Sequence, residues 1–288
     1  MDAIIRLAVP SDIEACGRIM HEAFKEINER HGFENIEVPS AESACGVAGF
    51  LIQNPSFYSL VAEAGGCIVG SCFLDERSSI RGVDIVSVDP AIQGQGVGRR
   101  LIEAVLEHSH GSRGIRLVQH TFNTTSMALY ASQGFEVKEP LLIMRGRLQN
   151  ETPGDVEVRP MLNQDLEACG ALCEKVHGFE RINELRDGLQ VFTPYVAQRA
   201  GRVVGYASAP TEWSANHGVA ETEDDMRALL LGINAVIPDP ITFLLPVRQK
   251  SFFRWCLDQG LRIVKPMTLM AIGEYREPAG CYFPSVAF

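Results

Sequence analysis

The chain has 288 residues, of which 46% are apolar, and this length favours two domains of ordinary size over one. Lys and Arg number 26 against 36 Asp and Glu, a net charge of −10, and neither half is basic, which excludes nucleic-acid binding through a basic surface. No apolar run approaches the ~20 residues that cross a bilayer. The segment 1–6 carries an acid and no long apolar core, so we expect neither a membrane span nor a signal peptide.

The first part of the chain returns later as a second copy. Residues 5–17 (IRLAVPSDIEACG) reappear as residues 158–170 (VRPMLNQDLEACG). Two shorter matches follow in the same order, 66–71 with 201–206 and 133–140 with 259–266. Such self-similarity indicates a tandem duplication. We therefore predict one domain at 1–150 and a shorter second one at 151–288, joined by a polar stretch at 149–155 that contains Pro and Gly.

Within the first copy, the pattern predicts alternating strands and helices of the α+β class. A short strand at Ile4–Leu7 precedes a capping box, Ser11-x-x-Glu14, which opens an amphipathic helix to about Glu29. Strands at 57–62 and 67–74 flank Gly65-Gly66, which is typical of a hairpin. The remaining predicted elements are, in order, a strand at 82–88, a helix at 98–108, a strand at 115–121, a short helix at 126–133 and a strand at 141–147.

The eight cysteines form no CxxC pair and no spacing typical of a metal site. Most lie in apolar patterns, as Cys67 and Cys72 do, and we interpret them as reduced core cysteines of a cytoplasmic protein without a metal site. These two thiols are also conceivable acyl acceptors, but packing is the preferred interpretation.

A glycine-rich loop follows the predicted strand at 82–88 and runs directly into a helix. Glycines at 94, 96 and 98 let backbone N–H groups approach a ligand, and the start of the helix adds unpaired donors and partial positive charge. With Arg99 and Arg100, the loop predicts a pyrophosphate site; a tight turn without a ligand is the alternative. It lacks the third glycine of the Rossmann fingerprint and the Lys-Ser/Thr of a P-loop, which argues against a phosphate-loop nucleotide binder.

A second polar cluster follows the predicted strand at 115–121. Asn123 stands where that strand ends, and its amide can both donate and accept hydrogen bonds. Tyr130 lies one helical turn after Ser126, on the same face. A phenol in this place can give a proton to a leaving thiolate, although a core tyrosine before a glycine helix stop is the alternative.

Together, the segments Gln93-x-x-Gly96-x-Gly98 and Asn123-x-x-Ser126-x-x-Leu129-Tyr130-x-x-x-Gly134-Phe135 resemble two motifs of the GNAT superfamily of acyl-CoA N-acyltransferases. The resemblance covers residues 1–148. It implies two tandem GNAT-like domains, each a mixed, mostly antiparallel β-sheet flanked by helices, and acetyl-CoA as the co-substrate. The residues that it assigns to acetyl-CoA are Val86, Ser87, Val88, Gln93, Gly94, Gln95, Gly96, Val97, Gly98, Arg99, Asn123 and Ser126.

The resemblance further implies direct acetyl transfer to an amine, with Tyr130 as the general acid. Two residues are candidate general bases: Asp84, on the strand entering the loop, and His120, whose imidazole titrates near neutral pH. A solvated strand-edge carboxylate and a polar packing residue are their respective alternatives. The acceptor, a small-molecule or peptide amine, cannot be identified from the sequence, nor can the oligomeric state. A non-catalytic acyl-CoA-binding or regulatory module is the alternative function.

The second copy departs from these motifs. Residues 221–228 (ETEDDMRA) align with residues 93–100 (QGQGVGRR), so the glycines are absent and four acids stand in this stretch, and Cys256 aligns with Tyr130. Acids in this place repel a pyrophosphate, and we interpret the run 221–225 as a solvated helix start. The second copy is therefore predicted to be degenerate.

Overall fold

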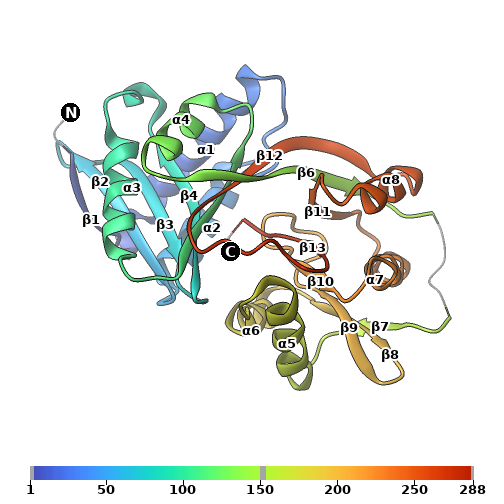
Figure 1. Ribbon diagram of the computed structural model, residues 1–288. Helices are drawn as coiled ribbons and strands as arrows, with labels where there is room; N and C mark the ends of the chain where they lie inside the picture. Colours follow the sequence, from blue (N-terminus) through green and yellow to red (C-terminus); the bar gives the residue numbers. More distant parts are fainter. Residues whose placement is uncertain (1–2, 150–153, 287–288) are drawn as a thin grey trace. The chain divides into compact units, whose positions relative to one another are not determined.

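The computed structural model describes residues 3–149 and 154–286, coloured along the chain in Figure 1. The chain divides into two compact units. The first comprises the residues up to Glu136 with Ala271–Gly273, and the second comprises Val137–Met270 with Glu274–Val286. The predicted linker falls partly on residues 150–153, which lie outside the described residues, and the domain boundary near residue 150 stays a prediction.

The first unit contains the strands and helices predicted for the first copy up to residue 133, with one further helix, whereas the last predicted strand, 141–147, lies in the second unit. Its elements are β1 (Ile4–Leu7), η1 (Pro10–Asp12), α1 (Ile13–Arg30), α2 (Ala41–Gln53), β2 (Phe57–Ala64), β3 (Cys67–Asp75), β4 (Ile80–Val88), η2 (Pro90–Ile92), α3 (Val97–His108), β5 (Gly114–His120) and α4 (Thr124–Ser132). The strands lie in the order β1-β2-β3-β4-β5, and all neighbours are antiparallel except β4 and β5. The predicted mixed, mostly antiparallel sheet is confirmed.

Helices cover both faces of this sheet. Gly70 on β3 faces α3, because a Cβ on Gly70 would lie 3.3 Å from Leu101. Its neighbour Ser71 points to the opposite face, toward Cys16 on α1. The core on the α1 side continues into α2; its buried members include Cys16, Met20, Ala44, Ala48, Leu51, Phe57, Val61 and Phe73.

For the first copy, one local expectation was wrong and one helix was missed. The side chain of Asp12 is buried at the start of α1, where it accepts a hydrogen bond from the Val9 N–H (2.9 Å) and pairs with Arg6, so the predicted capping box of Ser11 and Glu14 does not form. Helix α2 was not predicted, because Ala and Gly in its sequence leave no clear apolar period. Its N-cap is Ser40, whose hydroxyl accepts the Ser43 N–H at 3.1 Å.

The second unit begins with β6 (Glu136–Gly146), which pairs antiparallel with β11 (Ile241–Pro246). A five-stranded antiparallel sheet has the order β13-β10-β9-β8-β7. The other elements of this unit are β7 (Glu157–Pro160), η3 (Asn163–Asp165), α5 (Leu166–His177), α6 (Ile182–Val191), β8 (Tyr195–Arg199), β9 (Arg202–Ala207), β10 (Gly218–Ala220), α7 (Glu223–Val236), α8 (Lys250–Asp258), β12 (Arg262–Gly273) and β13 (Cys281–Phe283). The last three residues of β12 belong to the first unit.

The two units also repeat details of strand register and helix packing. The β2–β3 ladder shifts register between Ala62 and Glu63, and the β8–β9 ladder shifts between Ala197 and Gln198. Gly17 on α1 lies against Cys45 of α2, where a Cβ would come within 2.5 Å of the sulfur, and Gly170 on α5 lies equally close to Ile182. Glycine is therefore required in both copies for two helices to approach each other.

All eight cysteines are free, and six of them are buried. Cys67 is an exception to the predicted core role, because it is exposed at the start of β3, beside the hairpin turn. Residues 3–149 and 154–286 contain no helix long and apolar enough to span a membrane. Among these residues, no group of three or more His, Cys, Asp or Glu is placed to hold a metal ion.

Candidate active site

The site begins at an irregularity in β4. The β3–β4 ladder pairs Leu74 with Val83 and Cys72 with Val86, so two residues of β4, Asp84 and Ile85, oppose one residue of β3. An extra residue of this kind bends a strand and redirects its side chains. The bulge places the predicted base candidate Asp84 at the bend, partly exposed.

Strands β4 and β5 separate at the same point. Their parallel ladder joins Ile80–Val83 to Gly114–Leu117 and then ends. Beyond it, the segment Val86–Val88 pairs with β3 on one side, and no strand in the described part of the chain pairs with its other side. A strand edge of this kind offers N–H and C=O groups to an extended ligand that contains amides. Ser87 takes part through its backbone, because its hydroxyl is buried against that of Ser71, 2.9 Å away.

The predicted glycine loop forms the start of α3. Gly94 and Gly96 have φ angles of 79° and 86°, in the left-handed region that favours glycine, and a Cβ on either would meet nothing within 4 Å. The hydrogen bond from Arg100 N to Gly96 O (3.2 Å) is the one expected at the first turn of α3, so the N–H groups of Gly98 and Arg99 lie ahead of it at the helix terminus. An open, glycine-lined helix terminus of this kind can bind an anion.

Three elements meet at Gly98. A Cβ at this position would lie 3.4 Å from Leu129 on α4 and 3.6 Å from Val88 at the end of β4. Arg99 adds a hydrogen bond to Ser132 of α4 (3.1 Å), and Gln93 donates to the carbonyl of Val88 (3.2 Å). Gln95 is exposed in the loop, and Val97 is buried below it. The structure thus brings the two predicted motifs together beside the free edge of β4.

Helix α4 carries the second predicted group. Asn123 is its N-cap and accepts the Ser126 N–H at 3.1 Å, which leaves the side-chain NH2 of Asn123 as a donor. Tyr130 is buried, with its ring 6.0 Å from that of Phe135. Burial raises the pKa of Tyr130 well above its usual value, so the phenol stays protonated at neutral pH.

The two base candidates occupy different surroundings. Burial is the main cause of the raised pKa of Cys72, and the charge of Asp84 raises it further. Asp84 therefore lies near Cys72, which in turn lies near Tyr130. His120 is buried at the end of β5, with Nε2 2.8 Å from Oε1 of Glu37. Sequence reasoning missed Glu37, because the loop before the unpredicted α2 carries no motif.

The counterpart of the glycine loop in the second unit is a paired acidic cluster. Asp225 is buried, contacts Arg199 and bonds to Thr222, the N-cap of α7. Glu221 lies 2.7 Å from Arg202, and Glu223 contacts Arg227. The run does begin helix α7, as predicted, but it is only partly solvated, because Asp225 is buried and arginines pair with Glu221, Glu223 and Asp225. Cys256, in the place of Tyr130, is buried on α8.

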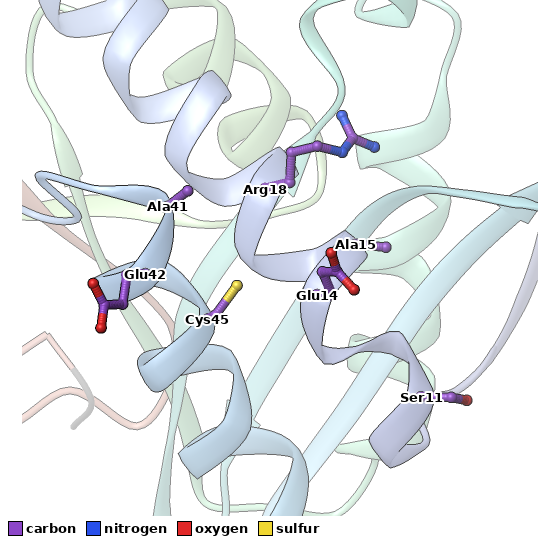
Figure 2. Close-up of a pocket in the computed structure, with 7 residues that line it drawn as sticks. All are labelled: Ser11, Glu14, Ala15, Arg18, Ala41, Glu42 and Cys45. Atoms are coloured by element: carbon purple, nitrogen blue, oxygen red, sulfur yellow. The ribbon is translucent and has the colours of Figure 1, made fainter.

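A separate cavity of about 520 Å³ lies between the first turns of α1 and α2 (Figure 2). Its lining residues are Ser11, Glu14, Ala15, Arg18, Ala41, Glu42 and Cys45, none of which belongs to the predicted motifs. The cavity therefore does not coincide with the free edge of Val86–Val88 or with the start of α3.

Comparisons with known proteins agree with this assembly. Residues 55–137 match the sequence profile of the family described as "Acetyltransferase (GNAT) domain". A stretch of 89 residues is 33% identical to N-alpha-acetyltransferase RimI of Mycobacterium tuberculosis and covers 30% of this chain and 56% of RimI. A stretch of 136 residues is 31% identical to mycothiol acetyltransferase of Nocardia farcinica and covers 44% of this chain and 43% of that protein. The chain thus spans about half the length of these two curated relatives.

Solved structures resemble the whole chain. A protein from Pyrococcus horikoshii, designated an acetyltransferase, superposes with a TM-score of 0.77 at 18% identity, covering 99% of this chain and 94% of its own. A tandem GNAT protein from the clavulanic acid biosynthesis pathway superposes with a TM-score of 0.60 at 12% identity, covering 94% and 98%. At these identities the likeness shows the tandem fold.

Proposed function

Because the chain contains an acetyltransferase domain of the GNAT family at residues 55–137, we propose that the protein transfers an acetyl group from acetyl-CoA directly to an amine. One observation carries the proposal. The unpaired edge of Val86–Val88 and the open start of α3 lie side by side, joined at Gly98. An amide-rich arm ending in a pyrophosphate, as in acetyl-CoA, needs these two features in contact.

In this proposal, the first unit binds the cofactor through its backbone. The N–H groups of the loop from Gln93 to Arg99 hold the pyrophosphate, and Gly94 and Gly96 keep this surface open. The edge of Val86–Val88 pairs with the pantetheine arm. Asn123 and Ser126, at the start of α4, line the other side of that arm.

The proposed reaction needs one acid and one base. The acceptor nitrogen attacks the thioester carbonyl, a C–N bond forms, the C–S bond breaks, and CoA leaves as a thiolate. Tyr130 donates the proton to that thiolate, because its phenol is protonated at neutral pH and can act as a general acid. A base, His120 or Asp84, takes the proton that the amine loses.

We propose a primary amine of a small molecule or peptide as the acceptor. The names of the two curated relatives refer to an N-alpha-acetyltransferase and a mycothiol acetyltransferase, which supports both kinds of acceptor without choosing between them. The free state of all eight cysteines supports a reducing, cytoplasmic location.

The test is an acceptor screen with purified protein and acetyl-CoA, in which release of the CoA thiol is measured against a panel of amines and peptides. Thiol release that depends on both acetyl-CoA and one amine supports the enzyme. Tight acetyl-CoA binding without turnover on any amine would instead support the non-catalytic acyl-CoA-binding module.

A further inference from the structure

The second unit contains a segment equivalent to the free strand edge of the first. In the first unit, Gly70 and Cys72 of β3 pair with Val88 and Val86 of β4. In the second, Gly205, the sequence counterpart of Gly70, pairs with Ala220, and Ala207 pairs with Gly218. Gly218–Ala220 is therefore the counterpart of Val86–Val88, the edge that the proposed function assigns to pantetheine.

This counterpart edge is filled by the chain itself. Strand β13 pairs antiparallel with it, residue by residue: Gly218 with Phe283, Val219 with Tyr282 and Ala220 with Cys281. The ring of Phe283 is completely buried over Gly218, where a Cβ would lie 2.1 Å away, and its centroid is 4.8 Å from that of Phe243 on β11. The strand is an integral part of the core.

The residue at the N-cap position of the following helix binds β13 through its side chain, which makes no capping hydrogen bond. Gln249 is the N-cap residue of α8, as Asn123 is of α4, and both stand eleven residues before a left-handed glycine, Gly260 or Gly134. The side chain of Gln249 donates to the Tyr282 carbonyl (2.6 Å) and accepts the Tyr282 N–H (3.2 Å). A side-chain amide here satisfies one peptide group completely, as it would satisfy an amide of pantetheine.

We propose that β13 occupies in the second unit the place that the pantetheine arm takes in the first, so that the second groove holds the chain's own backbone and no acyl-CoA. The proposal rests on the proposed function for the position of the first groove. In this proposal, the second unit binds no cofactor because β13 already occupies the groove. Repulsion by the acidic run 221–225 is then not needed to explain one cofactor per chain.

Hydrogen exchange of the intact protein, with and without saturating acetyl-CoA, tests this. We expect the amides of 86–88 to become protected when acetyl-CoA is added, and those of 218–220 to be protected already and unchanged. The matched variants are Asn123→Ala, expected to weaken acetyl-CoA binding, and Gln249→Ala, expected to leave affinity unchanged while speeding exchange of the Tyr282 amide. Added protection of 218–220 by acetyl-CoA would overturn the proposal. No response at 86–88 would instead contradict the proposed function.

A second inference concerns His120 and rests on a different contact. Glu37 accepts hydrogen bonds at both carboxylate oxygens, from His120 Nε2 at 2.8 Å and from the side-chain NH2 of Asn28 at 3.0 Å. A carboxylate only accepts, so Nε2 carries a hydrogen, and in the neutral ring the lone pair is on Nδ1. We infer that Glu37 is a positioning residue that presents Nδ1 of His120 as the base for the acceptor amine.

Ring packing holds the same orientation. Phe122 stacks on His120 with centroids 4.8 Å apart and planes 13° apart, and Phe24 meets it edge-on at 5.8 Å. Titratable side chains on the neighbouring elements include His21 and Lys25 on α1, His31 after it, whose ring contacts Phe122, Arg116 on β5 and Asp84 on β4. Asp84 is the rival base. This inference rests on the proposed function, so both are tested by measuring turnover.

The test uses Glu37→Gln, His120→Asn, Asp84→Asn and, as a control, Glu42→Gln on the exposed start of α2. We expect His120→Asn to lower kcat by at least ~10²-fold. Glu37→Gln should lower kcat by at least ~10-fold with acetyl-CoA affinity unchanged, because loss of a tautomer-fixing carboxylate lowers kcat by up to ~10⁴ in the Ser-His-Asp triad. Nitrogen-15 NMR should show His120 with Nδ1 unprotonated, and a mixture of tautomers in Glu37→Gln.

Unchanged kcat in Glu37→Gln and His120→Asn, with loss of turnover in Asp84→Asn, would overturn this second inference and leave the proposed function intact. Absence of turnover in the natural protein on every amine would contradict the proposed function itself.

Discussion

The guanidinium of Arg6 binds both carboxylate oxygens of Asp12, at 2.7 and 3.0 Å. The second unit repeats this pair as Arg159 and Asp165, at 2.7 and 2.8 Å. In each case the hydrogen bonds from the arginine lower the pKa of the aspartate, and each aspartate also accepts a backbone N–H. The pair joins the first strand of a copy to its first helix.

Stability should therefore fall on acidification through these pairs. A lowered folded-state pKa means that the contribution is present above the usual carboxyl pKa of about 4 and is lost as pH falls through the lowered value. We expect Asp165→Asn to lower the free energy of unfolding at pH 7 by about 2 kcal/mol and to flatten its pH dependence. Both tryptophans, Trp213 and Trp255, lie in the second unit. Their fluorescence during urea unfolding therefore measures the free energy of unfolding of the unit that carries Asp165→Asn. An unchanged pH slope would contradict the role of the pair; the exposed Glu167→Gln is the control.

Gly96→Glu should abolish acetyl-CoA binding. Its backbone is left-handed at the open start of α3, and a carboxylate there both strains the turn and repels a pyrophosphate. Gly32→Glu imposes the same strain at a φ of 75°, in the turn after α1, and is the matched control. Calorimetry on both variants, with circular dichroism as the folding check, separates the two effects. Equal loss of affinity in both would show that strain alone is responsible.

Tyr130→Phe should lower kcat by about 10²- to 10⁴-fold, the usual effect of removing a general acid, with little change in acetyl-CoA affinity. The ring remains, so its packing against Phe135 is retained. Steady-state kinetics with the acceptor found in the screen measures this. If kcat is unaffected, Tyr130 is a packing residue.

Titration calorimetry should give one acetyl-CoA per chain. The first unit offers the free edge of Val86–Val88, whereas the corresponding edge of the second is paired with β13. Two sites per chain would contradict the occupied groove. Gly96→Glu, which should reduce the number to zero, identifies the unit that binds.

Local motifs allowed much of the first unit to be predicted. The hairpin around Gly65-Gly66, the glycine loop before α3 and the cap at Asn123 depend on neighbouring residues and are visible in one sequence. The tandem copy was visible as well. These features define the predicted cofactor residues, and the structure brings them to one place.

What the sequence did not reveal depends on partners far apart in the chain. The bulge at Asp84 is a property of the β3–β4 register, and Glu37 meets His120 only through the fold. The acidic run at 221–225 looked solvated, because its arginine partners, such as Arg199 and Arg202, lie on other strands. Strand β13 was not predicted at all, since three residues carry no measurable period.

Strand β13 also has a consequence for the order of folding during synthesis. The sheet of the first unit from β1 to β5 is built from neighbouring segments, and its ladders can form as the chain leaves the ribosome. The β10 edge in the second unit must wait for Phe283, which is made long after Gly218. Until then, the apolar surface that Phe283 covers is open to solvent, so nascent chains halted before residue 281 should be captured by chaperones more readily than chains extended past it.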